Sequence, residues 1–145
     1  MKKMVLFLLP VLCLCGCESK LEHFTSVCSL KNDSMDIVDI KKTALTYNNK
    51  DESEKVVVTR TYKAKNNNGE IVIDGIKKSL ENYNNDLAKS DAAQIKIVKD
   101  EKDLYKLKYY FDVKKLTKEE LSSLEIKKNS IRYLNKLKKD NDKCE

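Results

Sequence analysis

The hydrophobic period of the chain changes at Asn66-Asn67-Asn68-Gly69, and this change constrains the fold more than any other feature. Before it, apolar residues alternate with polar ones, as they do in strands with one buried and one solvated face. After it, apolar residues recur at intervals of three and four, which is the period of an amphipathic helix. Asparagine and glycine favour turns over regular structure. The sequence therefore predicts strands first and then a helix.

Three strands are expected before the break. They are predicted over residues 24–30, 35–47 and 55–65. The second strand places Ile37, Val38 and Ile40 on both faces, and a bulge near Asp39 would reconcile this crowding with a strand. The turns between the three segments are short and polar, which favours an antiparallel meander.

Helices and strands alternate after the break. A helix is predicted over residues 70–89, and strands over residues 94–99 and 104–113. Thr117 followed by Glu120 has the pattern of a capping box, so a helix should begin at Lys118. This helix is expected to be interrupted near Asn129 and Ser130 and to restart after them. The apolar side of the restarted helix is expected to consist of Ile131, Leu134 and Leu137.

The order β-β-β-α-β-β-α is typical of an α+β fold. Its expected form is a mostly antiparallel sheet with helices packed on one face. The length allows one domain with a hydrophobic core.

The first 16 residues have the three parts of an export signal. Lys2 and Lys3 precede an apolar run from Met4 to Leu14, and Gly16 places a small residue before Cys17. The run is shorter than the roughly 20 residues that a membrane-spanning helix needs. A signal peptide is therefore expected, and not a membrane span.

The residues Leu14-Cys15-Gly16-Cys17 resemble the lipobox of bacterial lipoproteins. The resemblance implies that residues 1–16 are a lipoprotein signal peptide, that residues 17–22 are the lipidated cysteine and a tether, and that residues 23–145 form a single extracytoplasmic domain. Two or more acyl chains such as palmitate hold a protein stably on a membrane, whereas one chain does so only marginally. The expected location is the extracytoplasmic face of the cell membrane. An ordinary secretory signal and a released protein are the alternative.

The five cysteines leave one pair in the expected domain. Cys13 and Cys15 are removed with the leader and Cys17 carries lipid, so Cys28 and Cys144 remain. Outside the cytoplasm such a pair favours a disulfide. Two free thiols, in a host that does not make disulfides, are the alternative.

The expected mature protein is mildly basic. Loss of Lys2 and Lys3 lowers the formal net charge of +6 by two, and the remaining excess of basic residues is interpreted as a contribution to solubility.

Little in the sequence points to catalysis. Phosphate-binding, nucleophile-elbow, zinc-protease and calcium-loop motifs are absent from the sequence. His23 is the only histidine and is interpreted as a surface residue beside the tether. We expect no catalytic, metal-binding or cofactor-binding residues.

Two carboxylate pairs are the best candidates in the sequence for acid–base chemistry. Asp36 with Asp39 and Glu119 with Glu120 have no neighbour in sequence that would raise a pKa, so both pairs are interpreted as solvated charges.

Aromatic and basic residues share one predicted strand. The strand carries the aromatic residues Tyr105, Tyr109 and Tyr110 together with Lys106 and Lys108, a combination that some nucleic-acid and glycan binders use. Alternation sends the first two tyrosines to the predicted core, and an exported protein seldom meets RNA, so core packing is favoured.

Basic residues also flank the last predicted helix. Lys127-Lys128 and the run from Lys136 to Lys139 are placed to touch anionic headgroups or wall polymers. Asp140 and Asp142 dilute this charge, which favours a solvated helix face.

The pattern as a whole is similar to a known family. Cys28 after the tether, the stretch Thr59-Arg60-Thr61-Tyr62-Lys63, an amphipathic helix, a hairpin and Cys144 near the end resemble the small YehR-like bacterial lipoproteins of unknown function. The resemblance implies a fold and a location. We expect a non-catalytic binding or structural module, anchored to the membrane through lipid on Cys17, with a protein or cell-wall partner and no nucleic acid. A small surface enzyme or a tethered inhibitor of an extracellular hydrolase is the alternative.

Overall fold

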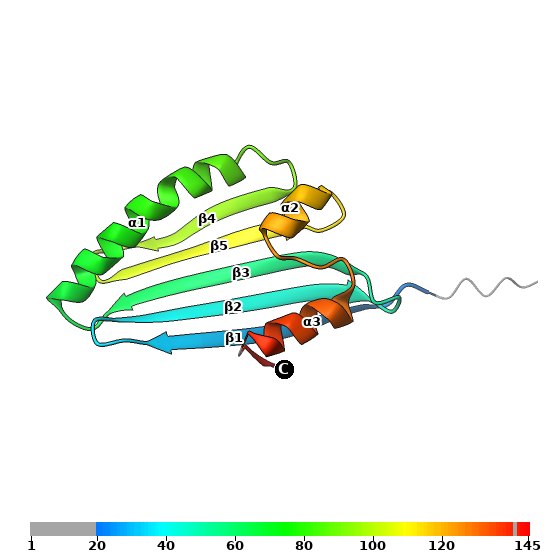
Figure 1. The fold of residues 1–145 in the computed structure, drawn as a ribbon, viewed down its shortest axis with the longest axis horizontal. Helices are drawn as coiled ribbons and strands as arrows, with labels where there is room; N and C mark the ends of the chain where they lie inside the picture. The colour runs from blue at the N-terminus through cyan, green and yellow to red at the C-terminus, as the bar shows by residue number, and fades with distance from the viewer. Residues whose placement is uncertain (1–19, 141) are drawn as a thin grey trace, which may run out of the picture.

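The computed structural model describes residues 20–140 and 142–145 (Figure 1). The expected mixture of helices with an antiparallel sheet is confirmed. The leader and Cys17 lie outside the described residues. The elements are β1 (His23–Asp33), β2 (Ile37–Asn48), β3 (Ser53–Ala64), α1 (Asn67–Leu87), β4 (Ala93–Asp100), β5 (Leu104–Asp112), α2 (Lys118–Ser123), α3 (Ser130–Lys139) and β6 (Lys143–Cys144).

All neighbouring strands of the six-stranded sheet are antiparallel, in the order β4-β5-β3-β2-β1-β6. Strands β1, β2 and β3 form the expected meander. Helix α1 then carries the chain to β4 at one edge, and β5 returns between β4 and β3. Strands β3 and β4 are therefore parallel to each other although they do not touch, a connection that needs a crossover element.

The sheet has two faces of different character. The core face carries the side chains that pack into the interior: Cys28, Leu45, Val56, Tyr62, Tyr105, Leu107, Tyr109 and Phe111 are all buried there. Residues between them along each strand point to the other side, which we call the outer face. The strand-to-strand register fixes which residues share a face, because neighbours across the ladder lie on the same side.

Helix α1 begins three residues earlier than predicted. The Asn66 side chain accepts a hydrogen bond from the Gly69 N–H at 2.9 Å, so this asparagine caps the helix instead of only interrupting the chain. Ile73 is fully buried, and Ile76, Leu80 and Leu87 pack against the core.

The capping box of α2 is confirmed, whereas the apolar side predicted for α3 is partly wrong. Thr117 Oγ1 accepts from the Glu120 N–H at 3.1 Å, and α2 begins at Lys118. In α3, Ile131 is 51% exposed, whereas Tyr133 and Leu137 are buried. The large ring of Tyr133 removes more surface from water than Ile131 would, so the helix presents a different stripe. The restart forms a separate helix capped by Asn129, so the element order differs from the predicted one.

The bulge expected near Asp39 is also wrong. Strands β2 and β3 pair regularly from Ile37 to Thr46, and the register shifts only beyond that point. Thr46 pairs with Lys55 and Tyr47 pairs with Ser53, so Glu54 is an extra residue without a partner on β2. The crowding in β2 is resolved because Val38 and Ile40 lie on the outer face, where hydrophobic side chains are tolerated.

Strand β6 was not predicted, and it ties the C-terminus to β1. Cys28 lies opposite Cys144 and the two form a disulfide, with Cα atoms 3.9 Å apart and a sequence separation of 116. Val27 and Glu145 exchange two backbone hydrogen bonds, at 3.1 and 2.9 Å. The cysteines therefore occupy the adjacent non-hydrogen-bonded position, where antiparallel strands approach most closely.

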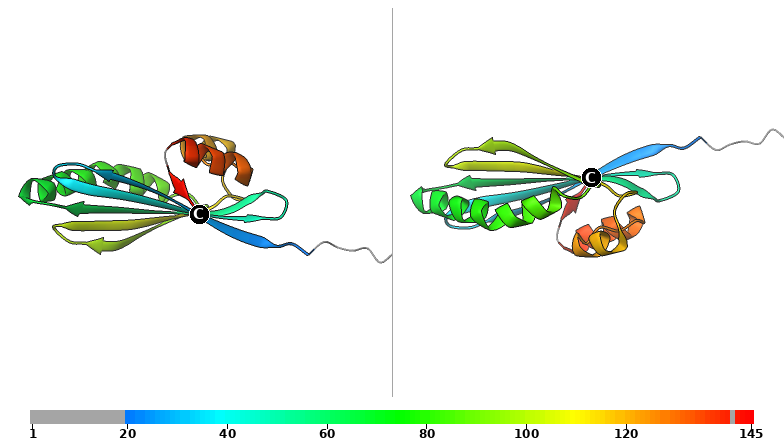
Figure 2. Two further views of the ribbon diagram at one scale, coloured as in Figure 1. Left: turned by 90° about the horizontal axis from the view of Figure 1, so that it is seen from below. Right: turned by 90° about the horizontal axis from the view of Figure 1, so that it is seen from above.

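The chain approaches β1 at the end of the sheet that holds the β2–β3 turn. Figure 1 shows this end opposite the start of α1, and Figure 2 shows the twisted sheet nearly edge-on. Across residues 20–140 and 142–145, no helix has the length and apolarity needed to cross a membrane.

Candidate functional site

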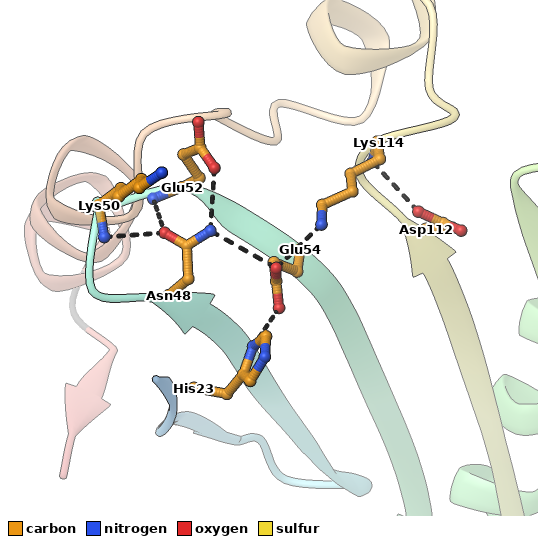
Figure 3. Close-up of polar contacts among 7 residues, drawn as sticks. All are labelled: His23, Asn48, Lys50, Glu52, Glu54, Asp112 and Lys114. Atoms are coloured by element: carbon orange, nitrogen blue, oxygen red, sulfur yellow. Dashed lines mark hydrogen bonds and ion pairs between the residues drawn. The ribbon is translucent and has the colours of Figure 1, made fainter. Parts of the chain in front are cut away.

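A cluster of polar side chains lies at the end of the sheet where β1 begins (Figure 3). Its centre is Glu54, which is only 8% exposed. His23 Nδ1 lies 2.7 Å from Glu54 Oε2, and Lys114 Nζ lies 2.9 Å from Oε1. The bulge explains this position, because an extra residue in one strand redirects a side chain out of the regular alternation.

Asn48 joins this cluster to the β2–β3 turn. Its side chain is buried and accepts backbone hydrogen bonds from Lys50 at 2.9 Å and from Glu52 at 3.2 Å. Its amide nitrogen donates to Glu52 Oε2 at 2.9 Å and lies 3.5 Å from Glu54 Oε1. Asp51 adopts a left-handed conformation with φ of 59° at the tip of the same turn. The asparagine therefore holds the turn against the buried carboxylate.

Electrostatics keep Glu54 ionised. The hydrogen bond from Lys114 lowers the pKa of the Glu54 carboxyl, burial opposes this effect, and the contact with His23 lowers the pKa further. A general acid needs a raised pKa, so Glu54 is unsuited to that role. Among the described residues, His23 forms a side-chain hydrogen bond with Glu54 alone, so no hydroxyl nucleophile is coupled to the imidazole. The cluster is best described as a charged network that fixes the end of the sheet.

A groove of about 350 Å³ lies over the core face. Its floor is formed by β3 and β5, including Tyr62 and Tyr109, and α1 contributes Leu80 and Tyr83. The segment from α2 to α3 forms the other wall, which includes Tyr133. Pockets of this size and aromatic content occur at small-molecule sites.

The groove contains one cation, and that cation is paired. Arg60 Nη2 lies 2.6 Å from Asp39 Oδ2, and the guanidinium carbon lies 5.3 Å from the centre of the Tyr62 ring. Burial raises the pKa of Tyr133 to about 12, and burial also raises the pKa of Tyr109. These hydroxyls stay neutral at physiological pH, and Tyr109 donates to Asn84 Oδ1 at 2.9 Å. The groove therefore suits neutral or weakly polar groups.

Three of the four carboxylates in the two pairs have structural partners, namely Asp36, Asp39 and Glu120. Asp36 Oδ1 accepts from Asn66 at 3.1 Å, and Asp39 is paired with Arg60, so the interpretation of Asp39 as a solvated charge is wrong. Glu120 accepts from the Ser90 hydroxyl at 2.6 Å as well as capping α2, and the Ser90 hydrogen bond lowers its pKa. Glu119 is exposed in the first turn of α2.

The aromatic strand divides between the two faces. Tyr105 and Tyr109 are buried, as core packing predicted. Tyr110 follows the alternation to the outer face with Lys106 and Lys108.

The basic residues near α3 are mixed with acids. Lys136 lies 2.9 Å from Glu125 and 2.7 Å from Asp140, whereas Lys127 and Lys128 are exposed. Lys41 Nζ lies 3.0 Å from the buried Asp142. Across residues 20–140 and 142–145, no group of three or more His, Cys, Asp or Glu residues is arranged to hold a metal ion.

Glu54, Lys114 and Arg60 were not identified from sequence as parts of a cluster or groove. The partners of Glu54 are 31 and 60 residues away along the chain, and a bulge has no sequence signature strong enough to locate it. The alternation of β3 did place residue 60 on the same face as Val58 and Tyr62, which was the available signal for Arg60.

Comparison with known proteins adds a fold relative. One solved structure, an NMR structure of a protein from Streptococcus pneumoniae TIGR4, is similar to this chain with a TM-score of 0.56 and 14% identity. The similarity covers 100% of this chain and 96% of that one. At this identity the likeness shows the fold alone. No family of proteins matches the sequence, and no curated protein matches it.

Proposed function

We propose that the chain is an extracytoplasmic lipoprotein, anchored to the cell membrane through lipid on Cys17, whose domain acts as a non-catalytic binding module. The observation that carries this proposal is the Cys28–Cys144 disulfide. Disulfides persist in oxidising compartments, and this one forms from the pair that leader removal and lipidation would leave. An extracytoplasmic location is therefore supported by both the leader and the domain.

The arrangement of the termini suits a short tether. β1 begins at His23, so five residues separate it from Cys17 and reach at most about 18 Å when extended. The C-terminal strand is paired with β1. Both ends of the domain are thus held by the sheet, which protects an exposed module from fraying and proteolysis.

A binding role is supported by the surfaces that the fold offers. We propose that α1, α2 and α3 together form one layer on the core face, an arrangement supported by the groove, because side chains from all three segments line it. The buried carboxylate of Glu54 contacts His23 and Lys114 and is part of the charged network at the end of the sheet. The groove and the outer face remain available to partners.

The anchor is tested with a matched pair of cysteine variants in the native host. Cys17→Ala should abolish metabolic labelling by fatty acid and release the protein from the membrane fraction or leave it unprocessed. Cys15→Ala changes a neighbouring cysteine of the leader and should retain the label. Equal labelling of the Cys17→Ala variant and the unaltered protein would contradict the proposal.

A further inference from the structure

One line of residues crosses the whole outer face and contains only lysines and hydroxyl side chains. The register places Lys143 of β6 beside Ser29, Ser29 beside Lys42, Lys42 beside Thr59, Thr59 beside Lys108, and Lys108 beside Lys96. We call these six residues the lysine row. Neighbouring strands are about 4.8 Å apart, so the row is about 24 Å long.

The next line of residues along the strands is also basic. It consists of Lys31, Ile40, Thr61, Lys106 and Lys99, in that order across the sheet. Lys96 and Lys108 face each other across the ladder, as do Lys99 and Lys106. Like charges directly opposite each other destabilise a sheet, so the fold tolerates an unfavourable arrangement here.

The four lysines of the lysine row have no ion pair with any described residue. Several cations elsewhere have a carboxylate partner: Arg60 with Asp39 at 2.6 Å and Lys41 with Asp142 at 3.0 Å on the core face, and Lys78 with Asp74 at 2.7 Å on α1. A surface that serves solubility alone intersperses both signs of charge. In the next line Lys31 pairs with Asp33 at 3.2 Å and Lys99 pairs with Glu101 at 3.0 Å. The lysine row itself has no such partners among the residues that the structure describes, and this concentration of positive charge points to an anionic partner.

The spacing of the lysines indicates which kind of anion the row can bind. Lys143, Lys42 and Lys108 are each separated by two strand spacings, about 10 Å, so a single phosphate group cannot contact all three. A linear polymer with repeating phosphates can contact all three lysines. Tyr110 is the one aromatic residue that the register places on the outer face, too few for the successive stacking that single-stranded nucleic acids use.

A hollow of about 290 Å³ adjoins the row on the same face. Lys55, Val57, Gln94 and Tyr110 line it, and all four lie on the outer face by register. Asp91, Asp112 and Lys115 also line the hollow. Amide and carboxylate oxygens accept hydrogen bonds from hydroxyls, so this lining suits a hydroxylated unit of a polymer and not a phosphate.

The position of the row favours a soluble polymer over the membrane surface. Ser29 lies six residues beyond His23, so the row is about 20 Å further along the sheet than the end at which the chain begins β1. This argument rests on the proposed anchor at Cys17, which would hold that same end near the bilayer. The row would then lie away from the headgroups.

From these observations we propose that the lysine row binds a linear polymer of hydroxylated units joined by phosphodiesters, with the polymer running across the strands. Ammonium groups contact the phosphates, and the hydroxyls of Ser29 and Thr59 lie between them. The interaction is electrostatic and should weaken as salt is raised.

The test uses the full lipidated protein in phosphatidylcholine vesicles, titrated with fluorescent poly(glycerol phosphate). A triple variant, Lys42→Gln, Lys96→Gln and Lys108→Gln, should bind at least about tenfold more weakly, since each lysine contributes several-fold to binding of an anionic surface. The control triple variant is Lys127→Gln, Lys138→Gln and Lys139→Gln. It removes the same charge from exposed lysines outside the row and should change the affinity less than about twofold.

Four results would overturn the proposal. The first three are absence of binding by the unaltered protein, equal losses in the two triple variants, and equally tight binding of a single-stranded DNA oligonucleotide. Tighter binding to phosphatidylglycerol vesicles than to the polymer would assign the row to the membrane and would also overturn it. If the protein does not bind to vesicles, it is titrated with the polymer in solution. Binding of the polymer there would show that the anchor fails and that the lysine row does not.

Discussion

Glu54 shows how a single residue outside the strand ladder can organise one end of a sheet. It has no partner on β2, and its carboxylate instead joins the first strand, through His23, to Lys114 beyond β5. A buried charge with this many partners is costly to disturb, because removing the carboxylate leaves its partners without their counter-charge. The network therefore contributes to the stability of the end of the sheet where β1 begins.

The variant Glu54→Gln should lower the free energy of unfolding by about 1–2 kcal/mol at neutral pH. The folded-state pKa of Glu54 is lowered from its ordinary value of 4.5, first by Lys114 and then by His23. Its stabilising effect is therefore present above pH 4.5 and lost as the pH falls through the folded-state value. Urea unfolding across this range should show the variant and the unaltered protein converging at low pH.

The control for this series is Glu119→Gln, which removes a carboxylate from an exposed position on α2. It should have only a small effect, of about 0.5 kcal/mol or less. A constant difference between Glu54→Gln and the unaltered protein down to the lowest pH would contradict the assigned charge network.

At the scale of helices and strands, a sequence pattern predicts an element correctly where all the residues that form the pattern are close together in the chain. Thr117 and Glu120 predicted α2 because a capping box needs only four neighbouring residues. The stripe of α3 was mistaken because Ile131 and Tyr133 are both apolar enough to be buried, and the choice between them depends on the sheet beneath. The start of α1 was placed late because asparagine both breaks and caps helices.

The two glycines of α1 give a paired prediction. A Cβ at Gly75 would meet no atom within 4 Å, so Gly75→Ala should raise the free energy of unfolding by about 0.5–1 kcal/mol. A Cβ at Gly69 would overlap the carbonyl oxygen of Asp36, so Gly69→Ala should lower it by about 1–3 kcal/mol. Urea denaturation of both variants measures the difference. Effects of the same sign would contradict the packing of α1 against the β1–β2 turn.

At the scale of the whole molecule, the sequence indicated the fold class but not the order of strands. The insertion of β5 between β3 and β4 depends on contacts between segments that are distant in the chain. Strand β6 has two residues, too few to show a period. The lysine row could not be found for the same reason, because its members come from all six strands and only the register aligns them.

The central proposal is that the mature protein begins at a lipidated Cys17 and carries an exported domain that is closed by a disulfide. An intact-mass measurement of protein extracted with detergent from membranes of the native host tests all three parts together. The expected mass is that of residues 17–145 with a diacylglyceryl group, with or without a third acyl chain, less two hydrogens for the Cys28–Cys144 bond. Reduction should then add two hydrogens. A mass that corresponds to the chain beginning at Met1, or to an unlipidated chain with both thiols free, would contradict the account.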